Sequence, residues 1–284
     1  MRQPLDKQPD TLKLGISPCP NDTFAFYALL HNLIDIGIKF DTVIKDVEAL
    51  NKSVMNRELD ISKVSFHAFA YVSDRYVLLP VGSALGRGCG PLLISKGIKS
   101  PNDLVNRTIA IPGKWTTASL LLRLFLPDAT NLKVMHFSAI PDAVALGEVD
   151  AGVIIHESRF TYMSKGLVCV QDLGSWWEDI SGLPIPLGGI IANRDIPRDI
   201  LYSISDAIGS SIKYAMAHPD HTRDFIKSLS QELDDEVIDN HINLYVNDFT
   251  LNLSEEGRRA LLALFSMGRE KSVLPSNCNG DLFL

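Results

Sequence analysis

Apolar and polar positions alternate in short blocks along the first third of the chain. Leu12, Leu14 and Ile16 repeat at every second position, which predicts a buried strand. The apolar blocks that follow predict two more strands, with a helix between each pair. The predicted strands are 11–17, 38–44 and 59–66, and the predicted helices are 24–33 and 47–56. This order predicts βαβ crossovers and a mainly parallel sheet with helices on its faces.

A second series of the same kind follows, and the end of the chain is helical. Its predicted strands are 92–94, 108–111, 134–137 and 151–155, and its predicted helices are 100–105, 118–125 and 140–146. From Pro197 the apolar spacing changes to that of amphipathic helices. These are predicted at 201–215, 219–230, 234–246 and 254–270.

A short internal repeat relates the two series. Glu58 and Asp60 lie at the start of one predicted strand, and Glu148 and Asp150 lie at the start of another. Position 58 is 90 residues before position 148, and position 60 is 90 residues before position 150. The match is either chance or the sign of two similar α/β lobes. If there are two lobes, ligands are expected in their shared crevice, beyond the carboxyl ends of the strands. The segments that follow strand ends are 17–23, 65–67, 113–117 and 156–159.

Two glycine-rich stretches are candidates for the links between lobes. They are 86–90, which carries three glycines, and 187–189, which carries two. Glycine tolerates the backbone changes that a hinge must absorb, although tight turns would explain the same residues. Neither 86–90 nor the sequence Pro-Gly-Lys-Trp at 112–115 fits a nucleotide-binding loop, because the spacing and the following elements differ.

Composition narrows the class of protein further. The 284 residues are 46% apolar and 21% charged, which is typical of a globular protein. Lys and Arg total 27 against 34 Asp and Glu, a net charge of −7 with no basic block, which argues against nucleic acid as a partner. No apolar run is long enough to span a bilayer, and the start of the chain lacks a secretory pattern, so we expect a cytoplasmic protein.

Cysteine and histidine are the residue types whose side chains could carry chemistry. The four cysteines have no CxxC pair, so neither a disulfide framework nor a metal site is predicted. Cys19 has no histidine near it in the sequence, which favours a packing role over a reactive thiol. His156 is the most informative of seven histidines, because it ends the apolar run 153–155 and should face the crevice. A structural role for His156 remains the alternative.

The other histidines and the tryptophan pair have simpler interpretations. His136 is predicted to pack within a strand, and Trp176 and Trp177 to form a buried plug. The remaining four histidines fall in helical or loop segments and are predicted to be solvated. They are His31, His218, His221 and His241.

Hydroxyl residues at predicted helix starts are candidates for anion binding. Thr116 and Thr117 directly precede the helix that begins near Ala118, and Ser65 lies at the start of another. Free N–H groups and the positive end of a helix dipole there would hold a carboxylate. Simple helix capping is the alternative for each, as it is for Asn21 and Asp22.

Two longer strings carry a family resemblance. Residues 17–24 read SPCPNDTF and residues 154–162 read IIHESRFTY, and a generic α/β fold explains neither. Together with 74–76, 85–88, 172–174 and 176–178, they resemble the 1,4-dihydroxy-6-naphthoate synthases of menaquinone biosynthesis, from about Leu12 into the C-terminal helices.

The resemblance implies an α/β, two-lobed fold similar to the type II periplasmic solute-binding proteins, with a ligand cleft between the lobes and a helical C-terminal part. On this basis we expect one lobe to comprise 1–92 and 194–284 and the other to comprise 93–193. Hinges are expected near 86–92 and 187–194.

The resemblance also implies an activity. The family splits cyclic dehypoxanthine futalosine into 1,4-dihydroxy-6-naphthoate and dihydroxyacetone. We therefore expect this chain to be a carbon–carbon lyase with a small carboxylated substrate and no cofactor or metal. The family's proton acceptor corresponds to His156. Its substrate contacts correspond to Lys63, Val64, Ser65, Thr117 and Ala118. The residues themselves add Asn21, Asp22 and Thr116 as further candidates, and Glu157 either orients His156 or pairs with Arg159.

Two other functions stay open at this point. One is a non-catalytic cytoplasmic protein that binds a small anion. The other is a sister enzyme of the same fold, such as the one that dehydrates chorismate.

Overall fold

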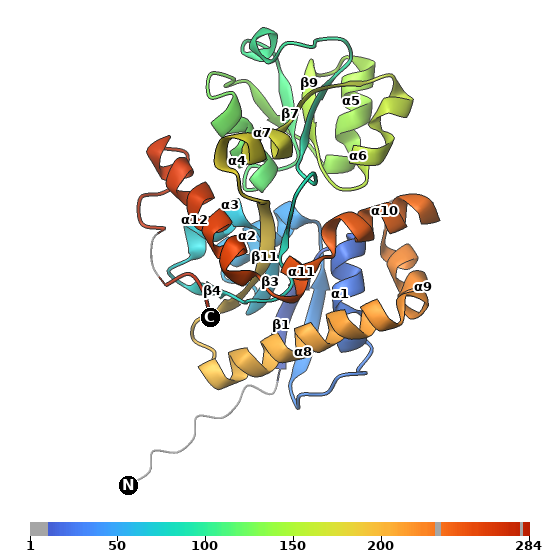
Figure 1. Ribbon diagram of the computed structural model, residues 1–284, viewed down its shortest axis with the longest axis vertical. Coiled ribbons are helices and arrows are strands. Elements are labelled where there is room, and N and C mark those ends of the chain that lie inside the picture. The colour runs from blue at the N-terminus through green and yellow to red at the C-terminus, as the bar shows by residue number, and fades with distance from the viewer. Residues whose placement is uncertain (1–10, 231–233, 279–280) are drawn as a thin grey trace.

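The computed structural model describes residues 11–230, 234–278 and 281–284, and it contains two β-sheets (Figure 1). The first has the strand order β2-β1-β3-β11-β4, with β5 paired to β11. Its strands are β1 (Thr11–Ile16), β2 (Lys39–Ile44), β3 (Ile61–Ser65), β4 (Tyr76–Leu78), β5 (Ala84–Gly86) and β11 (Ile185–Asn193). Residues 1–10, on which the prediction that the chain lacks a secretory pattern mainly depends, lie outside the described residues.

The second sheet is built from the middle of the chain and has the order β10-β6-β9-β7-β8. Its strands are β6 (Leu92–Ser95), β7 (Ile109–Ile111), β8 (Leu132–Val134), β9 (Ala151–Ile154) and β10 (Val168–Asp172). In Figure 1 this sheet and its helices form the upper part of the molecule, and the first sheet lies in the lower part.

Helices cover both sheets. Those between the strands are α1 (Pro20–Leu30), α2 (Val47–Met55), α3 (Phe66–Val72), α4 (Thr117–Phe125), α5 (Ile140–Leu146), α6 (Ser158–Thr161) and α7 (Leu173–Ser181), with the short 3₁₀ turns η1 (Pro101–Leu104), η2 (Phe137–Ala139) and η3 (Tyr162–Lys165). The C-terminal helices are α8 (Arg198–Ala217), α9 (Pro219–Leu229), α10 (Asp235–Tyr245), α11 (Asp248–Leu251) and α12 (Ser254–Glu270). The four longer C-terminal helices match the prediction, and α11 was not predicted.

The prediction of mainly parallel sheets is only half right. In the first sheet β1 pairs in parallel with β2 and β3, as the βαβ pattern requires. Strand β11 then returns from the second sheet and pairs antiparallel with β3, β4 and β5. In the second sheet β6 is likewise antiparallel to both of its neighbours. Both exceptions are next to points where the chain passes between the sheets, which a local pattern does not reveal.

The short internal repeat corresponds to a repeated structure. Asp60 precedes β3, and its carboxylate accepts a hydrogen bond from the Lys13 amide of β1 at 2.8 Å. Asp150 precedes β9, and its carboxylate accepts one from the Thr108 amide, next to β7, at 2.9 Å. In both sheets the carboxylate therefore ties together two neighbouring parallel strands at the same edge. This similarity agrees with the interpretation of the repeat as a sign of two similar α/β lobes.

The segment that links β5 to β6 packs against the start of α7. A β-carbon on Gly90 would collide with the backbone of Gly174, and one on Gly174 would collide with Gly90. The Leu173 amide also donates to the Pro91 carbonyl at 3.0 Å. We propose the two-lobe division that the sequence predicts, except that β11 (Ile185–Asn193) pairs within the first sheet.

The C-terminal helices complete the packing around the first sheet. Helix α8 packs against α1, and the Leu29 amide of α1 donates to the Ser211 hydroxyl at 3.2 Å. Helix α10 packs against α1 and β5, while α12 contacts both β11 and α4. The largest apolar core therefore runs from one sheet to the other, through Phe69, Leu121, Trp177 and Phe265. The tryptophan prediction holds for Trp177, which is fully buried.

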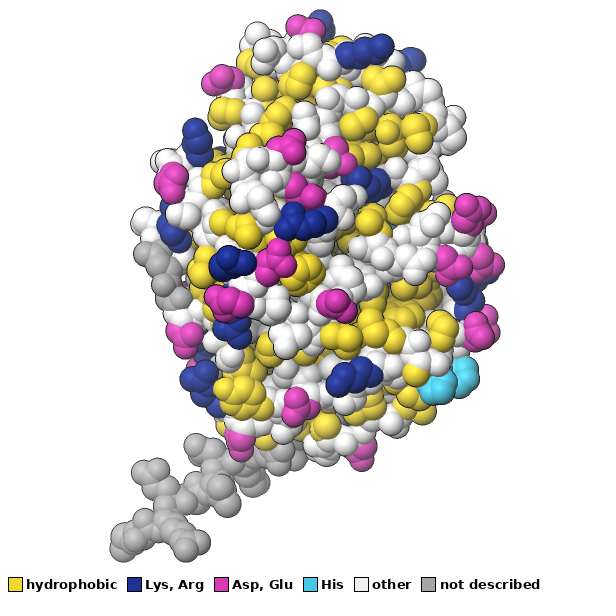
Figure 2. Space-filling view, in the orientation of Figure 1, with side chains coloured by type: hydrophobic (Ala, Val, Ile, Leu, Met, Phe, Trp, Pro, Cys, Tyr) yellow, Lys and Arg dark blue, Asp and Glu magenta, His cyan; other side chains and the backbone are white. Residues whose placement is uncertain are grey.

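The described part of the chain contains no helix that is long and apolar enough to cross a bilayer. On the face shown in Figure 2, Lys and Arg side chains lie among Asp and Glu side chains rather than in a separate patch.

Candidate active site

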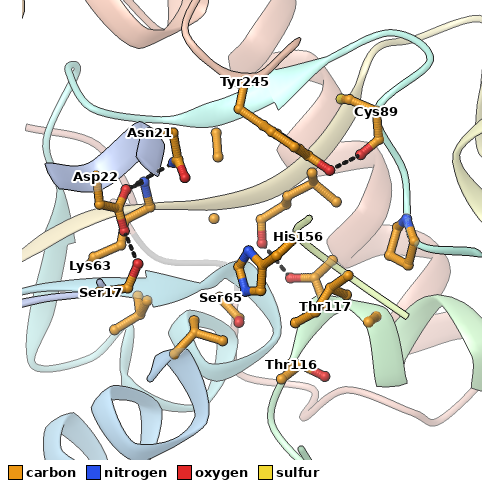
Figure 3. Close-up of a pocket in the computed structure, with 18 of the residues that line it drawn as sticks. Ser17, Asn21, Asp22, Lys63, Ser65, Cys89, Thr116, Thr117, His156 and Tyr245 are labelled. Carbon is orange, nitrogen blue, oxygen red and sulfur yellow. Dashed lines mark hydrogen bonds and ion pairs between the residues drawn. The ribbon is translucent and has the colours of Figure 1, made fainter. Parts of the chain in front are cut away.

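A pocket of about 650 Å³, partly open to solvent, lies where the two sheets face each other (Figure 3). All nine residues singled out from the sequence line it, although they come from both sheets. They are Asn21, Asp22, Lys63, Val64, Ser65, Thr116, Thr117, Ala118 and His156.

His156 lies near the centre of this pocket (Figure 3). It follows β9 and has φ of +57°, a left-handed conformation that costs energy for a residue with a β-carbon. The edge of its ring meets the ring of Phe137 at a centroid distance of 5.0 Å. The sharp turn from β9 into α6 therefore delivers the imidazole into the space between the sheets.

The surroundings of His156 keep its ring neutral. Loss of water around the imidazole lowers its pKa below the ordinary value, and the nearby charges of Glu157 and Asp22 oppose that effect only in part. A neutral imidazole has a free nitrogen lone pair at neutral pH. The ring can therefore accept a proton without first losing one.

Cys19 touches the same ring. Its Sγ lies 3.3 Å from Nδ1 and 3.6 Å from Nε2 of His156. Burial raises the pKa of the thiol well above its ordinary value, with Glu157 adding to the effect, so the group stays protonated. The packing interpretation agrees with this burial, but the sequence did not reveal that a distant histidine would lie against the sulfur.

A chain of polar groups lines the side of the pocket formed by the first sheet (Figure 3). The Lys63 ammonium forms an ion pair with Asp22 at 2.5 Å and donates to the Gly82 carbonyl at 3.1 Å. The Ser17 hydroxyl donates to the other oxygen of Asp22 at 2.6 Å, and the Asn21 amide donates to Asp22 at 3.0 Å. The charge of Lys63 is therefore neutralised within the protein. Its side chain orients Asp22 and Asn21.

His241 extends this chain, and the prediction that it is solvated is wrong. It is fully buried on α10, and its Nε2 lies 3.0 Å from the Asn21 side-chain oxygen. Ile238, His241 and Tyr245 are the buried residues of α10, at the spacing of one helix face. That spacing is the signal that could have identified His241. His31, His218 and His221 are exposed, as predicted.

His136 is also placed differently from its prediction. Strand β8 ends at Val134, so His136 lies after the strand and is exposed rather than packed within it.

The opposite side of the pocket is formed by the start of α4. The Thr116 hydroxyl caps this helix by accepting from the Ser119 amide at 3.2 Å. The amides of Thr117 and Ala118 have no carbonyl one turn back within the helix, since they lie in its first turn. The Thr117 hydroxyl donates to the Leu187 carbonyl of β11 at 2.5 Å. The helix start is therefore held against the first sheet with two amides available for an anion.

Ser65 lies beside that helix start at the end of β3. Its hydroxyl accepts from the Asn51 side chain at 3.2 Å, and its amide donates to Asn51 at 2.9 Å. Asn51 also donates to the Trp115 carbonyl at 3.3 Å, which joins α2 to the loop before α4. Asn51 was not predicted, because nothing in its sequence context separates it from other helix residues.

The loop after His156 is anchored by Arg159. Its guanidinium donates to the Gly90 and Gly88 carbonyls and forms an ion pair with Asp172 at 2.7 Å. Among the described residues the ion-pair partner of Arg159 is Asp172, and no ion pair joins Arg159 to Glu157. Within the described residues, no group of three or more His, Cys, Asp or Glu side chains is arranged to hold a metal ion.

Residues 12–270 match the model of a protein family described as menaquinone biosynthesis. A protein of Thermus thermophilus named 1,4-dihydroxy-6-naphthoate synthase is 46% identical over 93% of this chain and 96% of its own length. One of Streptomyces coelicolor with the same name is 42% identical over 94% of this chain and 96% of its own length.

Solved structures show the same fold. A protein of Archaeoglobus fulgidus superposes with a TM-score of 0.89 and 36% identity, covering 93% of this chain and 99% of its own. The alkanesulfonate-binding protein of Xanthomonas axonopodis superposes with a TM-score of 0.71 at 15% identity, covering 95% of this chain and 96% of its own. The expected fold, like that of periplasmic binding proteins, is confirmed.

Proposed function

This chain belongs to the menaquinone biosynthesis family, and we propose that it converts cyclic dehypoxanthine futalosine into 1,4-dihydroxy-6-naphthoate and dihydroxyacetone. The family and the names of the two relatives described above support an enzyme of this kind. The observation that carries the proposed mechanism is the position of the His156 imidazole in the pocket between the two sheets, where loss of water lowers its pKa.

The start of α4 is the proposed binding site for the substrate carboxylate. The Thr117 and Ala118 amides point from the positive end of the helix dipole, which favours an anion without a dedicated arginine. Lys63 would contribute only indirectly to binding of the substrate carboxylate, because Asp22 already neutralises its ammonium group.

His156 is the proposed base. It would take a proton from the bound ring system, and the electron pair left behind would complete the aromatic ring as the bond to the three-carbon fragment breaks. The fragment leaves with the electrons of that bond, and the imidazolium can return a proton to it. An enzyme with this chemistry is a carbon–carbon lyase, and the only catalytic group that the protein must supply is a positioned base. Enclosure between the lobes would keep water from the reactive intermediate.

The direct test is to incubate the purified protein with cyclic dehypoxanthine futalosine and to follow naphthoate absorbance or fluorescence. The proposal predicts catalytic formation of the naphthoate. A binding protein would instead show a higher melting temperature with this compound and form no product. Turnover of chorismate in place of the futalosine derivative would assign the sister activity.

A further inference from the structure

One hydrogen-bond acceptor in the pocket wall has no partner. His241 lines the pocket, and its ring lies 6.1 Å from that of His156 and 4.6 Å from that of Tyr245, measured between centroids. Its Nδ1 is buried and makes no hydrogen bond with any residue that the structure describes. Buried polar atoms are nearly always paired, so an unpaired one in a ligand pocket calls for a partner supplied by the ligand.

The neighbouring hydrogen bonds determine which nitrogen of His241 carries the hydrogen. Asp22 is held as an acceptor by the ammonium of Lys63, so the Asn21 side chain must present its NH₂ group to Asp22. The oxygen of Asn21 therefore faces Nε2 of His241, and Nε2 must be the donor in that 3.0 Å contact. Burial lowers the pKa of His241 well below its ordinary value, with His156 and Lys63 adding to the effect, so the ring is neutral. Nδ1 is left with a lone pair.

We propose that Nδ1 of His241 accepts a hydrogen bond from a hydroxyl group on the part of the substrate that leaves as dihydroxyacetone. This inference rests on the proposed function and extends it, because it makes His241 a residue that selects hydroxylated substrates. The substrate carboxylate cannot be the partner, since an ionised carboxylate only accepts hydrogen bonds.

The layout of the pocket agrees with this assignment. His156 lies between the Ser17, Asn21, Asp22 and Lys63 cluster on one side and Thr117 on the other (Figure 3). His241 joins that cluster through Asn21. A substrate with its carboxylate at the start of α4 therefore extends past His156 toward His241. The bond to be broken would lie beside the base, and the hydroxylated fragment would lie beyond it.

Two substitutions of His241 distinguish the roles of its two ring nitrogens. The longer amide of His241→Gln reaches the Nε2 position, so it can still donate to Asn21, but it leaves no acceptor at Nδ1. The shorter amide of His241→Asn reaches the Nδ1 position and can keep the acceptor while losing the bond to Asn21. We expect His241→Gln to raise KM for cyclic dehypoxanthine futalosine about tenfold, the effect of one lost hydrogen bond to a ligand. His241→Asn should raise it by less.

The affinity for the naphthoate product distinguishes a contact with the three-carbon fragment from a general structural role of His241. It retains the carboxylate and the aromatic rings but lacks the three-carbon fragment, so its Kd should be the same in His241→Gln and in the unsubstituted enzyme. His221→Gln makes the same chemical change at an exposed histidine and serves as the control, with KM and Kd unchanged.

The outcomes are distinct. If the enzyme turns over the substrate and His241→Gln raises KM but not the product Kd, the inference holds. A parallel rise in both constants, an unchanged KM, or a larger effect of His241→Asn would overturn it while leaving the proposed function intact. If the unsubstituted enzyme forms no naphthoate, the proposed function fails and the inference fails with it.

Discussion

At the scale of single residues, the site depends on a few side chains held in unusual positions. His156 has a left-handed backbone and a ring in contact with the Cys19 sulfur and with Phe137. Such strain persists only where the surroundings enforce it, and it is common at functional sites. These contacts with Cys19 and Phe137 restrict rotation of the ring, so the base is held in place before the substrate arrives.

Thr117 offers a prediction about the other side of the pocket. Its hydroxyl donates to the Leu187 carbonyl, so Thr117→Val would leave that carbonyl unpaired and loosen the start of α4. We expect substrate binding to weaken by about 1–3 kcal/mol, the cost of an unpaired buried polar group. Thr117→Ser keeps the hydroxyl and is the matched control. Titration of both variants with the naphthoate product measures the effect, and equal affinities in the two would place the anion site elsewhere.

Which site residues could be predicted depends on how local their signal is. His156, Ser65 and Thr117 follow strands or begin helices, and the rule that ligands bind beyond strand ends identifies them from sequence alone. Cys19 and His241 are distant in sequence from His156, and only the packed fold brings them to the pocket.

At the scale of elements, strand β11 sets the width of the pocket. Gly188 lines the pocket, and a β-carbon there would lie 2.5 Å from the Val64 carbonyl oxygen of β3. The two strands can approach so closely only because this residue has no side chain. The sequence makes the glycines at 187–189 candidates for a hinge or a tight turn. In the structure they lie within β11, where Gly188 allows close pairing with β3, and the hinge stays a prediction.

Replacing Gly188 tests this role. We expect Gly188→Ala to lower the melting temperature and to reduce kcat/KM at least tenfold, because either β11 or β3 must move away from the pocket. Gly209→Ala on α8 is the control, since its nearest neighbour would be 3.8 Å away. That change should stabilise the protein by about 0.5–1 kcal/mol through helix propensity. Thermal unfolding and steady-state kinetics of the two variants measure both effects, and equal behaviour would contradict the account of β11.

The elements themselves differ in how far the sequence determined them. The amphipathic spacing of Ile204, Ile208 and Ile212 predicts α8 because each position faces the core. The direction of β6 and β11 was not predictable, since strand direction depends on where the chain crosses between sheets and not on local spacing.

At the scale of the whole molecule, the two sheets are joined by contacts that converge on the site. Arg159, three residues after His156, binds the Gly88 and Gly90 carbonyls in the segment that passes from one sheet to the other. Thr117 reaches across to β11 on the opposite side. We expect any relative movement of the lobes to move His156 and the start of α4 together with respect to Asp22 and Lys63 of the other lobe, which would couple closure to catalysis.

Buried neutral histidines should make the whole molecule sensitive to acid. Burial lowers the pKa of His67 to about 4, and it also lowers the pKa values of His156 and His241. Unfolded histidine titrates near 6.5, so between about pH 6.5 and pH 4 the unfolded state binds protons that the native state does not. The free energy of unfolding should therefore fall as pH falls through this window, with about 2–3 kcal/mol from His67 alone by pH 4.5.

Urea unfolding between pH 4.5 and 7.5 measures this dependence. His67→Asn keeps a donor for the Thr116 carbonyl, which His67 contacts through Nδ1 at 3.0 Å, and removes the titrating ring. The variant should lose less stability on acidification than the unsubstituted protein. An identical loss in the two proteins would show that His67 is not a neutral, buried histidine.

The central claim is that the neutral imidazole of His156 removes a proton from a substrate bound between the two sheets. The most direct measurement determines two quantities for His156→Asn and for the unsubstituted enzyme. They are kcat with the substrate and Kd for the naphthoate product. The account predicts that kcat falls at least a hundredfold, the contribution of a positioned general base, while the Kd changes by less than about threefold. Turnover close to that of the unsubstituted enzyme, with the same product affinity, would contradict it.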